Sequence, residues 1–210
     1  MPDFSERTLA PLREALRAYM SPARYAHTLG VEQTVAQMAL LFAPQREGVL
    51  RAAALLHDLT KEYGEAQTAA VLEREGITLR PDEQASPQVL HAITAPAEIL
   101  RLYPDLADET LLSAVRWHTT GRAGMTVEEA LLYLADVVEP GRTYPACVAL
   151  REQLFTPALP QMTHAARLAH LRDVLYASLT STLNSLAARG RSACRETLEA
   201  AEDLKERKTL

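Results

Sequence analysis

The stretch that indicates the fold most clearly reads Ala53-Ala54-Leu55-Leu56-His57-Asp58-Leu59-Thr60-Lys61. This stretch overlaps the end of an alanine- and leucine-rich segment, over about residues 46–59, whose composition favours a helix. His57 lies seven residues after Leu50, which places it on an apolar face of that helix, and Asp58 follows directly. Because a buried ionised carboxylate needs a cation or good hydrogen bonds, the His57-Asp58 pair is the first candidate for a functional site.

Four more polar residues lie within apolar helical patterns, namely His27, His91, His118 and Asp136. A single core histidine is more often hydrogen-bonded than metal-bound, and a single buried aspartate often caps a helix or pairs with an arginine. Six such residues on successive helices are better explained together by a metal ion. Imidazole and carboxylate groups in combination suit a first-row metal such as iron, manganese or zinc.

Composition and local signals predict a helical protein. Aromatic residues make up only 5% of the 210 residues, and the alternating pattern typical of strands is missing. We read about eight to nine helices joined by short turns, with residues 77–87 as a loop and a kink or restart at Pro96. Asp108 is expected to cap one helix, and the segment from Thr126 to Glu129 forms a capping box ahead of another. The predicted fold class is therefore all-α.

The charge balance and the missing motifs exclude several classes of function. Twenty-two basic and 27 acidic residues give a net charge of −5, which disfavours binding to nucleic acid or to an anionic membrane. The signatures of dinucleotide-binding folds, P-loops, zinc proteases and hydrolase elbows are missing. No apolar run approaches the roughly 20 residues of a membrane-spanning helix. The charged N-terminal residues and the isolated Cys147 and Cys194 predict a cytoplasmic protein.

Four segments carry a more specific signal. They read RYAHTLGV at 24–31, AALLHDLTK at 53–61, WHTTGRAGM at 117–125 and YLADVVEPGR at 133–142. Together they resemble the YqeK-type subgroup of the HD-domain phosphohydrolases, the bacterial symmetrical diadenosine tetraphosphate hydrolases, over about residues 20–190. One segment departs from the pattern, because Ala92-Ile93-Thr94-Ala95-Pro96 follows His91 where a glycine-bearing segment is expected.

The resemblance implies an HD-domain helical bundle at 21–190, preceded by an N-terminal helix at 1–20. A C-terminal helix at 191–210 would pack on this domain or extend it. The resemblance further implies two metal ions, which are iron in family members of this kind; the residues themselves are also compatible with manganese or another divalent ion. One ion would bind His27, His57, Asp58 and Asp136, and Asp58 would bridge to a second ion that also takes His91 and His118.

The activity implied by the resemblance is symmetrical hydrolysis of diadenosine tetraphosphate into two ADP. A hydroxide bound between the two ions would attack a central phosphorus, because metal ions lower the pKa of bound water. Asp58 and Lys61 are expected to be catalytic. The expected partner is this small nucleotide, no protein partner is legible, and a homodimer is left open.

Five residues are candidates for binding the polyphosphate: Lys61, Thr119, Gly121, Arg122 and Arg142. Lys61 is one of only three lysines and follows Asp58 by three residues, which favours a phosphate contact. The bland alternatives are a solvated surface charge for the arginines, a helix cap for the threonine and a plain turn for the glycine.

Two other functions remain open at this stage. The same ligands would serve an HD-domain phosphohydrolase for another nucleotide, such as a 5′-nucleotidase or a nucleoside polyphosphate hydrolase, since function depends on the pocket rather than the fold. A non-catalytic sensor of metal or nucleotide is the second alternative. It is disfavoured because all six candidate ligands are present.

Overall fold

The computed structural model describes residues 2–210. This range contains eleven α-helices, four short 3-10 turns and no strand. The first helices are α1 (Glu6–Tyr19), α2 (Pro22–Phe42), α3 (Glu47–Leu56), α4 (Glu65–Arg74), α5 (Pro81–Gln84) and α6 (Leu90–Leu102). They are followed by α7 (Glu109–Trp117), α8 (Val127–Val138), α9 (Pro145–Leu154), α10 (His164–Ala188) and α11 (Arg195–Glu206). The 3-10 turns are η1 (Pro44–Arg46), η2 (Pro87–Val89), η3 (Pro104–Leu106) and η4 (Leu159–Gln161).

The predicted all-α fold is confirmed. The helices described number eleven, two more than the upper end of the predicted eight to nine. The additional helices are α5, inside the segment expected to be a loop, and α9. Both begin with a proline, Pro81 and Pro145 respectively. Proline marks loops in a sequence, but it is also favoured in the first helical turn, where its missing N–H costs no hydrogen bond. This double meaning explains why both helices were missed.

The observed helix boundaries agree with the predicted ones at two N-terminal caps and differ from the prediction at one proline. The Asp108 carboxylate accepts hydrogen bonds from the backbone N–H groups of Thr110 and Leu111 at the start of α7. Thr126 and Glu129 form the predicted capping box of α8. The expected restart at Pro96 was wrong, because α6 continues through it. Buried residues on both sides of the proline hold the two halves of α6 against the core.

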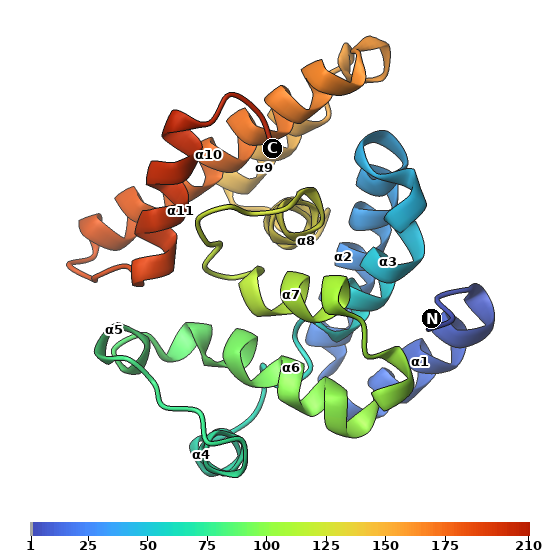
Figure 1. Cartoon of the computed structure of the whole chain (residues 1–210), viewed down its shortest axis with the longest axis vertical. Coiled ribbons are helices and arrows are strands. Elements are labelled where there is room, and N and C mark those ends of the chain that lie inside the picture. The colour runs from blue at the N-terminus through green and yellow to red at the C-terminus, as the bar shows by residue number, and fades with distance from the viewer. Residues whose placement is uncertain (1) are drawn as a thin grey trace.

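Helix α8 lies at the centre of the molecule and organises the core. Figure 1 shows it almost end-on, with α2 and α3 on one side and α9 and α10 on the other. Its residues from Glu129 to Ala135 are all buried, which matches a helix that is covered on every side. Helices α2, α7 and α10 pack against it.

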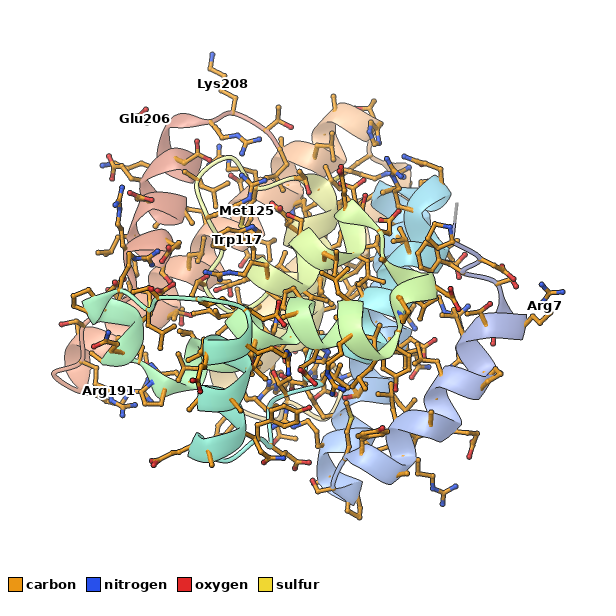
Figure 2. All side chains as sticks on the ribbon, turned by 60° about the horizontal axis from the view of Figure 1, so that its bottom comes forward. Arg7, Trp117, Met125, Arg191, Glu206 and Lys208 are labelled. Atoms are coloured by element: carbon orange, nitrogen blue, oxygen red, sulfur yellow. The ribbon has the colours of Figure 1, made fainter. Side chains whose placement is uncertain are left out.

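The remaining helices cover the outside of this central group. Helix α1 packs on α3, α4 packs on α6, and α11 packs on α10. Met125 lies inside the body in Figure 2, whereas Arg7 and Lys208 project from its surface. In the described range, 2–210, no helix is both long and apolar enough to cross a lipid bilayer.

Candidate metal centre

Five helices bring the six predicted ligands into one cluster, which we call the His/Asp cluster. Three of its members lie within helices: His27 in α2, His91 in α6 and Asp136 in α8. The others lie where helices end, because α3 stops at Leu56 rather than near residue 59 and α7 stops at Trp117. His57 and His118 are thus the C-cap residues of two neighbouring helices, and Asp58 follows the first of them.

The two C-cap histidines have the same local geometry. Nδ1 of His57 lies 2.6 Å from the carbonyl oxygen of Ala54, and Nδ1 of His118 lies 2.7 Å from that of Val115. A helix leaves its last carbonyl groups without backbone donors, so each imidazole satisfies one of them by donating its Nδ1–H. This hydrogen bond fixes the tautomer and leaves the Nε2 lone pair of each ring facing the cluster.

Asp58 lies at the middle of the cluster. Its Oδ1 is 3.2 Å from Nε2 of His91 and 3.8 Å from Nε2 of His118. Its Oδ2 is 3.3 Å from Nε2 of His57 and 3.8 Å from Nε2 of His27. The two carboxylate oxygens therefore face two different pairs of histidines, which is the arrangement that a bridging ligand requires.

The donor atoms form two groups that share Asp58. His27, His57 and Asp58 make one group, and Asp58, His91 and His118 make the other, with donor atoms within 4.8 Å of one another in each. Asp136 adds to the first group, because its Oδ1 lies 3.0 Å from Nε2 of His27. Two donors bound to one metal ion at about 2.0–2.3 Å lie ~3–4.5 Å apart, so these spacings fit metal coordination.

The hydrogen bonding of His57 supports the same conclusion. Its side chain is completely buried, and its Nε2 makes no hydrogen bond with any of residues 2–210. An unsatisfied buried nitrogen is costly, and a metal ion on its lone pair would remove that cost. The residues present therefore fit a pair of divalent ions, in which imidazole donors outnumber carboxylates.

The electrostatics of Asp58, His91 and His118 favour the protonation states that metal ligands need. Burial alone would raise the pKa of the Asp58 carboxyl, but the neighbouring His57 holds it well below its usual range. Burial and the neighbouring His118 lower the pKa of His91, and burial together with His57 lowers the pKa of His118 to about 4. At neutral pH the two histidines are neutral and the carboxylate is ionised, as binding of a divalent cation requires.

Three of the predicted substrate-binding residues lie at the cluster. The Lys61 Nζ is 3.2 Å from Nε2 of His91, and the Thr119 hydroxyl is 3.1 Å from Nε2 of His91 and 3.0 Å from Nε2 of His118. Arg142 donates to Oδ1 of Asp136 at 2.7 Å. These positions place one ammonium, one hydroxyl and one guanidinium beside the candidate metal ligands.

Gly121 and Arg122 have other surroundings. Gly121 has a φ of +65°, and a Cβ atom added there would lie 3.1 Å from Sδ of Met125 and 3.3 Å from Cβ of Ala200. Arg122 donates to Glu129, the residue of the α8 capping box. These contacts give both residues a structural role in the loop before α8, and their role in substrate binding stays a prediction.

Comparison with known proteins identifies the family. The HD domain family matches residues 24–141, a span that contains all six members of the cluster. The chain belongs to the HD-domain family. This HD-domain protein is 33% identical over 144 residues to "Bis(5'-nucleosyl)-tetraphosphatase, symmetrical" of Halalkalibacterium halodurans, covering 68% of the present chain and 75% of the relative. The protein of that name from Bacillus subtilis is 31% identical over 147 residues, with coverages of 70% and 75%.

A solved structure extends the likeness to the whole fold. The predicted HD superfamily hydrolase involved in NAD metabolism from Clostridium acetobutylicum superposes with a TM-score of 0.81 at 26% identity. The match covers 96% of this HD-domain protein and 98% of that chain. The predicted all-α HD-domain fold is thereby confirmed.

Sequence reasoning missed two residues that contact the candidate ligands of this HD-domain protein. The Arg24 guanidinium binds Oδ2 of Asp58. Oε1 of Glu139 lies 3.1 Å from Nδ1 of His27, and its other oxygen accepts from the backbone N–H of Gly141. Both residues lie within the quoted segments, RYAHTLGV and YLADVVEPGR, and their charge next to a predicted ligand was the available signal.

Two glycines make room for the Glu139 carboxylate. A Cβ atom at Gly30 would lie 2.6 Å from its Oε2, and one at Gly141 would lie 2.9 Å from both of its oxygens. Any larger residue at either position would push the carboxylate away from His27. Glu139 is therefore closely packed between α2 and the segment after α8, and it fixes the tautomer of His27 as the backbone carbonyls fix those of His57 and His118.

Replacing Glu139 by glutamine is expected to weaken metal binding while preserving the fold. The amide is a poorer acceptor for the His27 Nδ1–H, and partners of metal-bound histidines typically contribute about 10–100-fold to metal affinity or activity. Titration of the metal-free protein with Mn²⁺ measures the effect. Glu152→Gln, at an exposed position of α9, is the matched control. Equal affinity of the Glu139 variant and the control would contradict the assigned role.

Proposed function

We propose that this HD-domain hydrolase cleaves diadenosine tetraphosphate symmetrically into two ADP. The observation that carries the proposal is the pair of donor groups sharing Asp58, with Lys61, Thr119 and Arg142 beside them. Such a centre combines room for two cations with groups that bind phosphate. The curated relatives from Halalkalibacterium halodurans and Bacillus subtilis carry the name of this activity.

The cluster residues would hold the ions in the arrangement that the family resemblance implies. His27, His57 and Asp136 would bind one ion, His91 and His118 the other, and Asp58 both. Two bound divalent cations supply an activated water at neutral pH and offset negative charge on the reacting phosphate. Iron is the metal that the family resemblance implies, and manganese also suits this set of imidazole and carboxylate donors.

The charged residues around the cluster would orient the polyphosphate. Lys61 is half-buried on the His91 side, while Arg24 and Arg142 lie on the His27 side. These three cations bracket the candidate metal ligands, so a chain of phosphates crossing the centre would contact a cation at each end. Thr119 can donate its hydroxyl to a phosphate oxygen between them. This positioning favours attack at the middle of the substrate over attack near one end.

Product analysis tests the proposal. Purified protein carrying its native metal is incubated with diadenosine tetraphosphate, and the products are separated by anion-exchange chromatography. Two ADP per substrate are expected. Formation of ATP and AMP would mean asymmetric cleavage and would overturn the proposal. Hydrolysis of other nucleotides in preference to this one would instead support a different HD-domain phosphohydrolase.

A further inference from the structure

The molecule has a cavity that borders the His/Asp cluster and that the proposed chemistry leaves unused. Its volume is about 310 Å³, and it lies between α4 and the segment formed by η2 and the start of α6. Lys61 and His91 line it on one side and also belong to the metal centre. A ligand held in this cavity could therefore extend past Lys61 to the His/Asp cluster.

The far walls of the cavity are mainly apolar. They comprise Leu72, Leu90, Pro87, Ala69 and the ring of Tyr63. Leu72 and Leu90 are held in place by a small hydrophobic cluster with buried Val89 and Ile93. A preformed apolar wall of this kind suits a flat, uncharged group of the size of a nucleobase, because small-molecule sites begin at roughly 300 Å³.

The tyrosine ring is fixed in its position. The Tyr63 hydroxyl donates to Oε2 of Glu98 at 3.1 Å, and Glu98 is buried and also bound by Arg74 and Arg101. A ring held this way loses little freedom when a base stacks on it, so the stacking energy is available for binding.

The polar lining sets the direction of the ligand. Lys61 is the cation at the end nearest the metal centre, while Glu65, Thr68 and Gln88 line the remainder. The Glu65 carboxylate disfavours a phosphate there, but it can accept hydrogen bonds from ribose hydroxyls or from the amino group of a base. The phosphates would thus lie at Lys61 and the nucleoside beyond it.

We propose that this cavity is the binding subsite for one nucleoside of the substrate, with Tyr63 as the stacking surface. The inference rests on the proposed function for the identity of the phosphates, and it adds the residues that recognise the nucleoside attached to them. The two halves of a symmetrical dinucleotide would then have different surroundings, because the His27 side is lined instead by Arg24, Arg142 and the exposed Tyr144.

Filling the cavity tests the subsite. Ala69 and Ala70 are adjacent exposed residues of α4, but only Ala69 lines the cavity. Ala69→Trp is expected to weaken ADP binding by about tenfold or more, because the indole would occupy the space of the base. Pyrophosphate, which lacks a nucleoside, should bind the variant as it binds the wild type. Ala70→Trp should change neither affinity. Calorimetric titration of the metal-loaded proteins measures both ligands without any turnover.

The outcomes separate the subsite from the proposed function. ADP binding that is unchanged in Ala69→Trp, or an equal loss of ADP and pyrophosphate binding, would overturn the subsite even if diadenosine tetraphosphate is hydrolysed. Selective loss of ADP binding in Ala69→Trp, with Ala70→Trp unchanged, would support the subsite even if the wild-type protein fails to cleave the dinucleotide. A thermal midpoint equal to that of the wild type establishes that the variant is folded.

Discussion

Asp58→Asn is expected to lower kcat/KM for diadenosine tetraphosphate by at least about 10³-fold, which corresponds to about 4 kcal/mol of transition-state stabilisation. Asp58 is the only residue shared by both donor groups within residues 2–210, so its loss should reduce the affinity for both ions together. An amide has the size of the carboxylate but no charge, and it binds divalent cations poorly in a set of neutral histidines. Metal content and turnover are measured on one preparation.

The control for this variant is Asp105→Asn. Asp105 is exposed in η3, and its replacement should change neither metal content nor turnover. A purely structural carboxylate at position 58 would behave differently from a ligand. Its removal would lower the thermal midpoint but leave the metal content and the turnover of the folded molecules unchanged. That result would contradict the proposed metal centre.

Removal of the metal is expected to have an effect of similar size. Chelation should lower the activity by about 10³-fold or more, because the protein groups alone supply no activated water. Fe²⁺ or Mn²⁺ should restore it, whereas Mg²⁺ and Ca²⁺ should not, since they prefer oxygen donors and four of the six candidate ligands are histidines. Activity after dialysis against each ion is the measurement.

Metal binding can also be measured without turnover, through the thermal stability of the protein. A ligand at about 100 times its dissociation constant stabilises the folded state by about 2.7 kcal/mol, which for a chain of this length raises the thermal midpoint by ~5–10 °C. Addition of Mn²⁺ to the metal-free protein should give such a shift, and the Asp58→Asn variant should lack it. Equal shifts in both proteins, or full activity with Mg²⁺ alone, would contradict the proposed ligand set.

Much of the fold and the family could be predicted from the sequence because the informative features are local. The Asp108 cap and the box of Thr126 and Glu129 are formed by residues three or fewer positions apart, so they are legible in the sequence and occur as expected. Apolar periodicity likewise predicted that His27 and Asp136 lie on inward faces of their helices, and both are partly buried in the His/Asp cluster. The prolines were less reliable, because Pro81 and Pro145 begin helices while Pro96 lies inside one, and only the packing around each decides which occurs.

Polar contacts between distant segments were beyond the reach of sequence patterns. Glu139 and His27 are separated by 112 residues, and Arg24 and Asp58 by 34, so no spacing rule connects them. Arg122 and Arg142 each follow a predicted ligand, and the sequence alone does not distinguish the two loops in which they lie. The structure binds the first to Glu129 and the second to Asp136, because the chain turns differently after α7 and after α8.

The sequence by itself determined that the protein is all-α, that it belongs to the HD-domain family, and which six residues are candidate ligands, since helix periodicity and motif identity are properties of short segments. Tertiary structure alone decided that Asp58 faces both donor groups and that a nucleoside-sized cavity borders Lys61. It also decided that Glu139 fits between Gly30 and Gly141. The physical reason is that shared ligands, cavities and close contacts arise from the relative placement of helices, which depends on the packing of the whole core.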